Sequence, residues 1–309
     1  MADSGGKFKI MKRVIITGAT GAIGIALIKE LINKKVEVLV FTRKESKRNC
    51  NIPKSNYIQI KYCSLSNLKN ISNESNIEYD VFFHLAWAGT SGEDRNDKKL
   101  QEKNVEYALD AVECAKRFKC KKFVGIGSQA EYGRADCPLT ENTPTKPENE
   151  YGKAKLKASI LTKQKSLENG LEFNWIRVLS VFGPNDGGNT LISYAIKQFM
   201  KNEELDVTKC EQIWDYLYSE DAAKAIILVA KKGIKNKTYV LGSGSSRPLK
   251  EYLEDIKRVM KSNSVINYGK IPYIKNQTMS LYADISDLLL LGWTPKISFK
   301  KGILKIKNK

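Results

Sequence analysis

Residues 14–24 read Val14-Ile15-Ile16-Thr17-Gly18-Ala19-Thr20-Gly21-Ala22-Ile23-Gly24, and this stretch decides the fold. Val14–Thr17 predicts a short buried strand, and apolar residues recur at helical spacing over Gly24–Asn33. The glycines between them allow a tight turn, so that the helix N-terminus can face a pyrophosphate. The spacing is G-x-x-G-x-x-G and not the standard G-x-G-x-x-G. An ordinary strand-to-helix turn is the alternative, but the position between a strand and an apolar helix favours dinucleotide binding.

Short apolar strands alternate with helices through the first half of the chain. The predicted strands are Val36–Phe41, Tyr57–Tyr62, Val81–Leu85, Lys122–Ile126 and Phe173–Phe182, and the further predicted helices are Lys103–Arg117 and Tyr151–Asn169. This alternation predicts an α/β fold of the Rossmann type, a doubly wound parallel sheet with helices on both faces. A ligand is then expected beyond the carboxyl ends of the strands.

The regular alternation weakens after Pro184, where loops rich in Gly, Asn and Asp follow. We therefore predict a dinucleotide-binding domain over residues 11–183. A smaller α+β substrate domain is predicted over residues 184–309, partly interleaved with the first. Residues 1–10 are interpreted as a leader, because Met11 is followed at once by a strand pattern.

The 309 residues carry 52 Lys and Arg against 34 Asp and Glu, a formal net charge of +18. The lysines are scattered, which favours a solvated basic surface over a nucleic-acid site, and a positive field would attract a phosphate-bearing substrate. Six cysteines without a C-x-x-C pair and one histidine, His84 in an apolar run, argue against a zinc site and a Ser-His-Asp hydrolase. No apolar stretch approaches the ~20 residues that span a bilayer, so we expect a cytoplasmic protein without a membrane partner.

The end of the second strand bears on the choice of nicotinamide cofactor. An Asp or Glu there would bind the ribose 2′-hydroxyl of NAD, whereas a basic residue accepts the 2′-phosphate of NADP. The chain reads Phe41-Thr42-Arg43-Lys44, so Arg43 favours NADP, with NAD as the alternative. The competing interpretation is that Arg43 is one more surface cation in a basic protein.

Three polar residues form a candidate proton-transfer group. Tyr151 and Lys155 are four apart at the start of a predicted helix and therefore share one face. A lysine cation about 4–5 Å away would lower the pKa of the tyrosine by roughly two to three units, which suits a general acid or base. Ser128 follows the fifth strand and could orient a carbonyl group. A Tyr-x-x-x-Lys pair alone is a weak signal in a lysine-rich helix.

These features, taken in order, resemble the extended short-chain dehydrogenase/reductase family, in its nucleotide-sugar epimerase, dehydratase and ketoreductase branch. The resemblance covers nearly all of residues 11–300. It rests on the glycine turn, His84-Leu85-Ala86, Asn104, Ser128 before Tyr132-Gly133, Tyr151 with Lys155, Arg177 to Gly183-Pro184, Asp215-Tyr216, Asp221-Ala222-Ala223 and Leu291-Gly292-Trp293-Thr294-Pro295.

The resemblance implies roles for individual residues. Tyr151 would exchange the proton, Lys155 would lower its pKa and bind the nicotinamide ribose, and Ser128 would hydrogen-bond the reacting oxygen. The residues expected at the cofactor are Gly18, Thr20, Gly21, Ala22, Ile23, Gly24, Arg43, Leu85, Ala86, Trp87, Asn104 and Lys155. Those expected at a nucleotide-sugar substrate are Arg95, Gln129, Ser180, Trp214 and Arg247. Packing of the strand end is an equally good interpretation of Trp87. A homodimer is expected because relatives pair through the helix that bears Tyr-x-x-x-Lys.

Departures from the family pattern narrow the function. Gln129 and Ala130 stand where dehydratases carry an acid pair, which argues against 4,6-dehydration. Ser180 and Trp214 stand where many epimerases carry Asn and Arg, so diphosphate binding must be rearranged, with Arg247 or a lysine as a candidate. Ser64 replaces an Asp that usually contacts adenine.

The leading hypothesis is therefore an oxidoreductase in which NADPH reduces a keto nucleotide-sugar and Tyr151 donates the proton. The alternative is an NAD-dependent nucleotide-sugar 4-epimerase, which the same three residues would serve. A non-catalytic dinucleotide-binding protein is the remaining hypothesis, and the presence of both Tyr151 and Lys155 counts against it.

Overall fold

The computed structural model of the chain describes residues 11–188 and 190–308, so the predicted leader lies outside the described residues. A seven-stranded parallel sheet has the strand order β10-β6-β5-β4-β1-β2-β3. Its strands are β1 (Arg13–Thr17), β2 (Glu37–Thr42), β3 (Ile58–Tyr62), β4 (Val81–His84), β5 (Lys122–Ser128), β6 (Glu172–Val178) and β10 (Thr238–Leu241). The predicted Rossmann-type α/β fold is confirmed.

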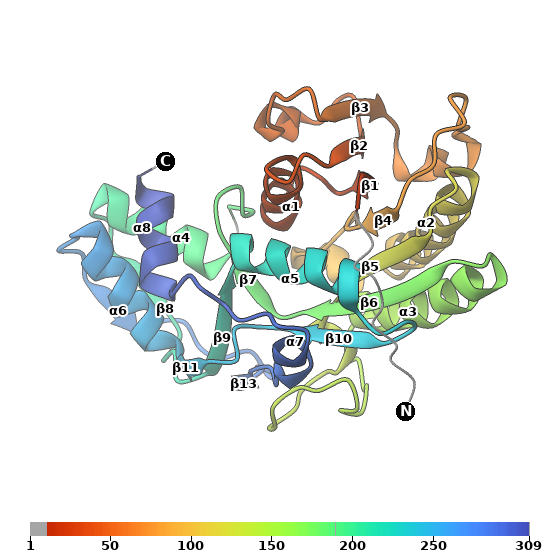
Figure 1. Cartoon of the computed structure of the whole chain (residues 1–309). Coiled ribbons are helices and arrows are strands. Elements are labelled where there is room, and N and C mark those ends of the chain that lie inside the picture. The colour runs from red at the N-terminus through yellow and green to blue at the C-terminus, as the bar shows by residue number, and fades with distance from the viewer. Residues whose placement is uncertain (1–10, 189, 309) are drawn as a thin grey trace.

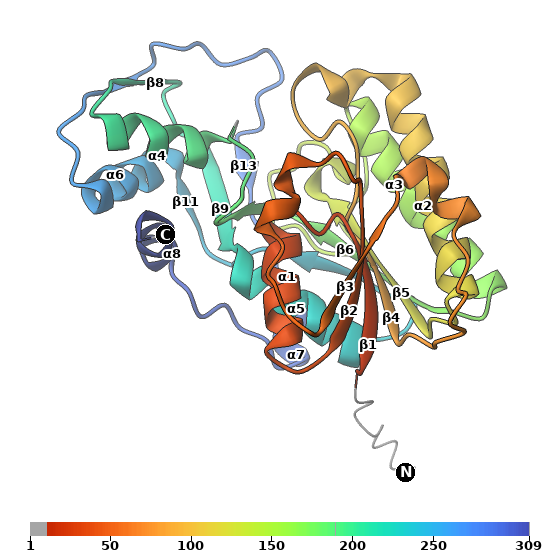
Figure 2. The ribbon, with the colours of Figure 1, turned by 90° about the horizontal axis from the view of Figure 1, so that it is seen from above.

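Helices cover both faces of this sheet, as Figures 1 and 2 show. On one face lie α1 (Ala22–Ile32), α5 (Ser219–Lys232) and α7 (Ser286–Leu290). On the other lie α2 (Lys98–Arg117) and α3 (Glu150–Glu168). Each face buries its own apolar cluster, and Phe82 and Phe83, neighbours on β4, enter opposite clusters because strand side chains alternate.

Short 3-10 turns connect several of these elements near the carboxyl ends of the strands. They are η1 (Lys47–Asn51), η2 (Leu65–Asn70), η3 (Gly92–Asn96) and η4 (Gln129–Glu131). The helix predicted from Lys103 begins five residues earlier, at Lys98, because the side chain of Asp97 accepts a hydrogen bond from the Leu100 amide and caps the helix.

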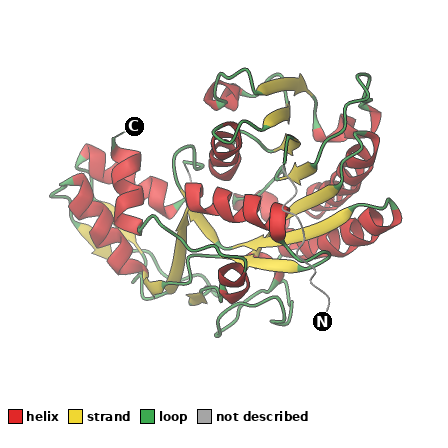
Figure 3. Ribbon diagram, in the orientation of Figure 1, coloured by secondary structure: helices red, strands yellow, loops and turns green. Residues whose placement is uncertain are grey.

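A second part lies beside the carboxyl ends of the large sheet, at the left of Figure 1. Its strands are β7 (Ser180–Phe182), β8 (Leu205–Val207), β9 (Ile213–Tyr218), β11 (Ser246–Pro248), β12 (Ile266–Tyr268) and β13 (Ser280–Leu281), and its helices are α4 (Leu191–Lys201), α6 (Leu249–Met260) and α8 (Phe299–Lys307). Strands β7, β11 and β13 all pair with β9. Figure 3 shows the helices of this part stacked against its strands.

The single strand predicted over Phe173–Phe182 is wrong, because the chain changes sheets at Leu179. Strand β6 pairs with β5 and β10, whereas β7 pairs with β9 in the second part. After β7 and β9 the chain also returns to the large sheet. Helix α5 packs on α1, and strand β10 forms one edge of the large sheet. Residues of both halves therefore meet around the carboxyl ends of the parallel strands. Within the described residues, no helix is long and apolar enough to cross a membrane.

Candidate active site

A cavity of about 540 Å³ lies beyond the carboxyl ends of β1, β2 and β4. Gly18 turns the chain here with φ of +73°, and a Cβ at Gly18 would collide with the backbone of Leu85 and Ala86. At Gly21, by contrast, a Cβ would meet no protein atom closer than 4.0 Å. A phosphate group can therefore approach the backbone at Gly21 and the N-terminus of α1.

The cavity brings together part of the predicted cofactor set. The predicted residues that line it are Gly18, Thr20, Gly21, Arg43, Leu85, Ala86 and Trp87. The others, Ala22, Ile23, Gly24, Asn104 and Lys155, do not line it. Gly24 is packed against Gly18 and Ala19, where a side chain would not fit. Asn104 is buried and uses its amide on Ala88, donating to the Ala88 carbonyl at 2.9 Å and accepting from the Ala88 amide at 3.0 Å.

The far end of the cavity is basic. Arg43 and Arg48 line it together with Ser46, Ser64 and Ser66, and no Asp or Glu is among the lining residues that the structure describes. Asn49 stabilises this turn, since its side chain donates to the Arg43 carbonyl at 2.8 Å. The sequence analysis missed Ser46 and Arg48. Their signal was a short polar segment directly after Arg43, which folds back as η1.

His84 is structural, as its apolar surroundings indicated. It is 2% exposed, and its Nδ1 lies 2.9 Å from the hydroxyl oxygen of Thr17 on the neighbouring strand. Burial, assisted by the charge of Lys155, lowers the pKa of His84 to about 3. The imidazole is therefore neutral at physiological pH and ties β1 to β4.

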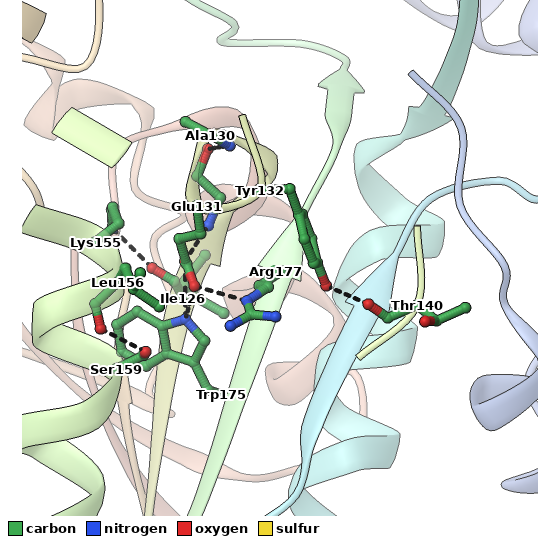
Figure 4. A network of polar contacts seen from close by, with 11 residues as sticks. Ile126, Ala130, Glu131, Tyr132, Thr140, Lys155, Leu156, Ser159, Trp175 and Arg177 are labelled. Carbon is green, nitrogen blue, oxygen red and sulfur yellow. Dashed lines mark hydrogen bonds and ion pairs between the residues drawn. The ribbon is translucent and has the colours of Figure 1, made fainter. Parts of the chain in front are cut away.

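Ser128, Tyr151 and Lys155 come together between β5 and α3. Asn149 caps α3 by accepting a hydrogen bond from the Gly152 amide, which places Tyr151 and Lys155 in its first turns. All three side chains are buried, and Ser128 hydrogen-bonds to Tyr151. The Nζ of Lys155 donates to the Ile126 carbonyl at 2.7 Å, a contact visible in Figure 4.

The predicted lowering of the pKa of Tyr151 by Lys155 is wrong for this structure. Burial raises the pKa of Tyr151, and the opposing influences are the Ser128 hydrogen bond and the charge of Arg95. Lys155 points toward Ile126, with its Nζ 5.9 Å from the Tyr151 ring centroid, and burial lowers its own pKa to about 7. Tyr151 is therefore protonated at neutral pH, as a proton donor must be.

Glu131 is a buried acid that the sequence analysis missed. Its carboxylate accepts from the Ser128 amide at 2.9 Å, from the Trp175 indole at 3.0 Å and from Arg177 Nε at 2.7 Å. Figure 4 shows Glu131 with Trp175 and Arg177, to the right of Lys155. This network fixes the backbone of Ser128, and the negative charge favours the protonated form of Lys155 by raising its pKa. The available signal was an acid three residues after the end of an apolar strand.

The predicted substrate residues fall into two groups. Arg95 and Gln129 lie with the buried trio, Arg95 with its guanidinium carbon 4.3 Å from the Tyr151 ring centroid and Gln129 directly after Ser128. Ser180, Trp214 and Arg247 lie in the second part, where Trp214 donates to the Ser180 hydroxyl at 2.7 Å. Arg247 pairs with Asp255 at 2.7 Å and stacks on Tyr252. The structure does not bring Arg247 into contact with the first group.

Comparison with known proteins agrees with this geometry. The sequence profile of the NAD dependent epimerase/dehydratase family matches residues 14–242. The CDP-abequose synthase of Salmonella muenchen is 26% identical over 96% of this chain and 97% of its own length. The dTDP-4-dehydro-6-deoxyglucose reductase of Escherichia coli is 26% identical over 95% of this chain and 96% of its own.

Solved structures share the fold over 96% of this chain. The UDP-glucose 4-epimerase of Thermotoga maritima, solved with UDP-glucose, superposes with a TM-score of 0.86 at 21% identity and covers 96% of this chain and 97% of its own. The UDP-glucose 4-epimerase of Thermus thermophilus, solved with NAD, has a TM-score of 0.85 at 19% identity, and RMD from Pseudomonas aeruginosa, solved with NADPH, has 0.80 at 19%. Both cover 96% of this chain and 98% of their own. Similar structures thus hold either nicotinamide cofactor.

Proposed function

Because the chain belongs to the NAD-dependent epimerase/dehydratase family, we propose that it reduces a keto nucleotide-sugar with NADPH, with Tyr151 as the proton donor. The observation that carries this proposal is the basic end of the cofactor cavity, where Arg43 and Arg48 lie among serines. A 2′-phosphate would receive charge-assisted hydrogen bonds there, while a bare ribose would meet no carboxylate partner.

The buried trio supports the chemistry of reduction. The nicotinamide ring, when bound, supplies a hydride to the carbonyl carbon. Tyr151 transfers its phenolic proton to the resulting alkoxide, and the Ser128 hydroxyl hydrogen-bonds the same oxygen. The tyrosinate left behind faces the guanidinium of Arg95, whose positive charge offsets the negative charge of the phenolate.

The second part of the chain is proposed to bind the nucleotide half of the substrate. Ser180 and Trp214 present a hydroxyl and an indole on β7 and β9, and Arg247 lies opposite Trp214 on β11. Release of Arg247 from Asp255 would supply a cation for a diphosphate. The basic net charge of +18 favours an anionic substrate of this kind.

A homodimer is also proposed, through α3 and its neighbour α2. Ile160 and Leu167 on α3 are 59% and 49% exposed, which leaves apolar surface for a second copy to cover. Sedimentation velocity on the wild type and on Ile160→Lys checks this: a dimer that the lysine converts to a monomer supports the pairing. A wild-type monomer contradicts it.

The second candidate is an NAD-dependent 4-epimerase, which the fold similarity to UDP-glucose 4-epimerases favours. A mass-spectrometric screen of UDP-, GDP-, CDP- and dTDP-linked keto sugars with NADPH separates the two. Net reduction with freely exchanging NADPH supports the reductase. NAD that survives purification, with interconversion of sugar epimers and no net reduction, supports the epimerase instead.

A further inference from the structure

We propose that Gln101 is a positioning residue: it holds the indole of Trp87 over the Lys155 ammonium and so aligns the proton-transfer group. This inference rests on the proposed function. Gln101 lies in the first turns of α2, faces the loop that joins β4 to α2, and is 1% exposed. It touches neither Tyr151 nor Ser128 in the contacts that the described residues make, so it would act through the loop.

The carboxamide of Gln101 is fully engaged across this loop. Its Oε1 accepts from Trp87 Nε1 at 2.8 Å, and its Nε2 donates to the carbonyls of Gly89 at 2.8 Å and Asp94 at 2.9 Å. The Gln101 side chain thus binds the loop near both of its ends. The loop also packs so tightly around Gly89 that a residue with a side chain would not fit there. A Cβ there would lie 2.6 Å from Leu100 and 3.1 Å from the Gln101 nitrogen.

The indole that Gln101 orients supports the buried lysine. The Nζ of Lys155 lies 3.8 Å from the Trp87 ring centroid, and the Trp87 and Tyr151 rings are perpendicular with centroids 6.2 Å apart. In the described residues, Lys155 has no carboxylate within ion-pair distance, and its Nζ hydrogen bond goes to a backbone carbonyl. An aromatic face stabilises a desolvated ammonium by cation–π attraction, which an aliphatic side chain cannot supply.

The same amide also positions the second cation of the site. Asp94, held by Gln101, precedes Arg95, whose Nη1 donates to the Thr90 carbonyl at 3.0 Å and whose guanidinium covers the Tyr151 ring. Gln101 therefore contacts the segments that place both Trp87 and Arg95 beside the Tyr151 ring.

Asn104 makes it possible to distinguish an effect of Gln101 on the position of Trp87 from an effect on the folding of the loop. It binds both backbone groups of Ala88, so the loop remains attached to α2 when Gln101 is changed. Gln101→Leu, which preserves the approximate volume, should therefore release the Trp87 indole without detaching the loop.

Steady-state kinetics with NADPH and the keto sugar found in the screen test the inference. Gln101→Leu is expected to lower kcat about tenfold to a hundredfold, since small misplacement at a reacting centre has effects of that size. The KM for NADPH should change less than kcat, because Arg43, Arg48 and the glycine turn, which also line the cofactor cavity, make no contact with Gln101 among the described residues. Gln198→Leu is the matched control, since Gln198 also donates to a backbone carbonyl, at 3.0 Å, but on α4 in the second part.

A double-mutant cycle shows whether Gln101 acts through Trp87. Trp87→Phe keeps an aromatic ring but removes the N–H group that donates a hydrogen bond to Gln101. Once that partner is lost, Gln101→Leu should lower kcat by a smaller factor than in the wild-type background, because only its bonds to the Gly89 and Asp94 carbonyls remain to be broken. Additive losses would overturn the inference, as would wild-type kcat in Gln101→Leu.

A second measurement does not depend on turnover. The chain has four tryptophans, so 5-fluorotryptophan labelling yields few ¹⁹F signals, and Trp87→Phe assigns that of Trp87. This signal should move in Gln101→Leu and in Lys155→Met but not in Gln198→Leu. An unmoved signal in Gln101→Leu overturns the inference. A moved signal in a protein that reduces no keto sugar overturns the proposed function alone and still supports the Gln101–Trp87 contact.

Discussion

The guanidinium carbon of Arg95 lies 4.3 Å from the centroid of the Tyr151 ring, so the cation closest to the phenol comes from the loop before α2. The charge of Arg95 lowers the pKa of Tyr151 against the larger effect of burial, which raises it. Proton transfer from Tyr151 leaves a tyrosinate, and Arg95 would stabilise that charge as it forms.

Arg95→Met should therefore lower kcat about tenfold, which corresponds to about 1.4 kcal/mol of lost transition-state stabilisation by a partly exposed cation. Arg95→Lys should keep most of the activity, because it keeps the charge. Turnover at saturating substrate is the measurement. Equal losses in both variants would mean that the shape of Arg95, and not its charge, matters.

Tyr151→Phe should abolish turnover, because it removes the proposed proton donor while keeping the aromatic ring that contacts Trp87 and Arg95. General acid catalysis contributes about 10²–10⁴-fold, so kcat should fall by at least this much. Cofactor affinity, followed by quenching of protein fluorescence on NADPH titration, should be unchanged. Turnover near the wild-type rate would exclude Tyr151 as the acid.

Arg43→Ala and Arg48→Ala should each weaken NADPH much more than NADH. A charge-assisted hydrogen bond contributes about 1.5–3 kcal/mol, so the dissociation constant for NADPH should rise roughly tenfold to a hundredfold. Arg13→Ala is the control, because Arg13 is an exposed arginine that pairs with Glu37 at the start of β1. Equal effects of the cavity variants on both cofactors would show that no 2′-phosphate binds there.

Lys155→Met should change the pH dependence of stability. The pKa of Lys155 is about 7 in the folded chain, and a lysine in an unfolded chain has about 10.4. Between these values the unfolded state binds more protons, so the contribution of Lys155 to the free energy of unfolding rises with pH. The Lys155→Met variant lacks this pH-dependent contribution. Its free energy of unfolding, relative to that of the wild type, should therefore be highest at pH 6 and decline toward pH 9.

Urea denaturation at pH 6, 7.5 and 9 measures this difference, which can change by up to ~1.4 kcal/mol per pH unit. Lys153→Met, on the exposed side of the same helix, should show no such trend. A difference between Lys155→Met and wild type that stays constant with pH would contradict the lowered pKa of Lys155.

Glu131→Gln should destabilise the fold by about 3–5 kcal/mol, because it leaves the buried guanidinium of Arg177 without its counter-charge. Adding Arg177→Met should restore part of the loss, since the unpaired charge is then removed. Glu148→Gln breaks the exposed pair with Arg134 and should cost less than ~1 kcal/mol. The free energy of unfolding in urea is the measurement, and similar losses for the two glutamates would contradict the role of burial.

Local sequence patterns were enough to predict the alternation of strands and helices, the glycine turn, and the shared face of Tyr151 and Lys155. Side-chain periodicity and turn chemistry are properties of neighbouring residues, so they are readable from one segment at a time. The prediction failed over Phe173–Phe182, because the change of sheets at Leu179 depends on partners in β9 and β10, far along the chain.

The tertiary structure alone decided the electrostatics of the site. Lys155 is directed by the Ile126 carbonyl and the Trp87 ring, and Glu131 becomes a buried partner of Arg177 only when β5 and β6 pair. Burial and distance control the pKa values of such groups, and both are set by contacts between residues tens of positions apart. The amino-acid sequence therefore determined which side chains could transfer a proton, and the packing of the loop from Trp87 to Arg95 determined which cations face Tyr151.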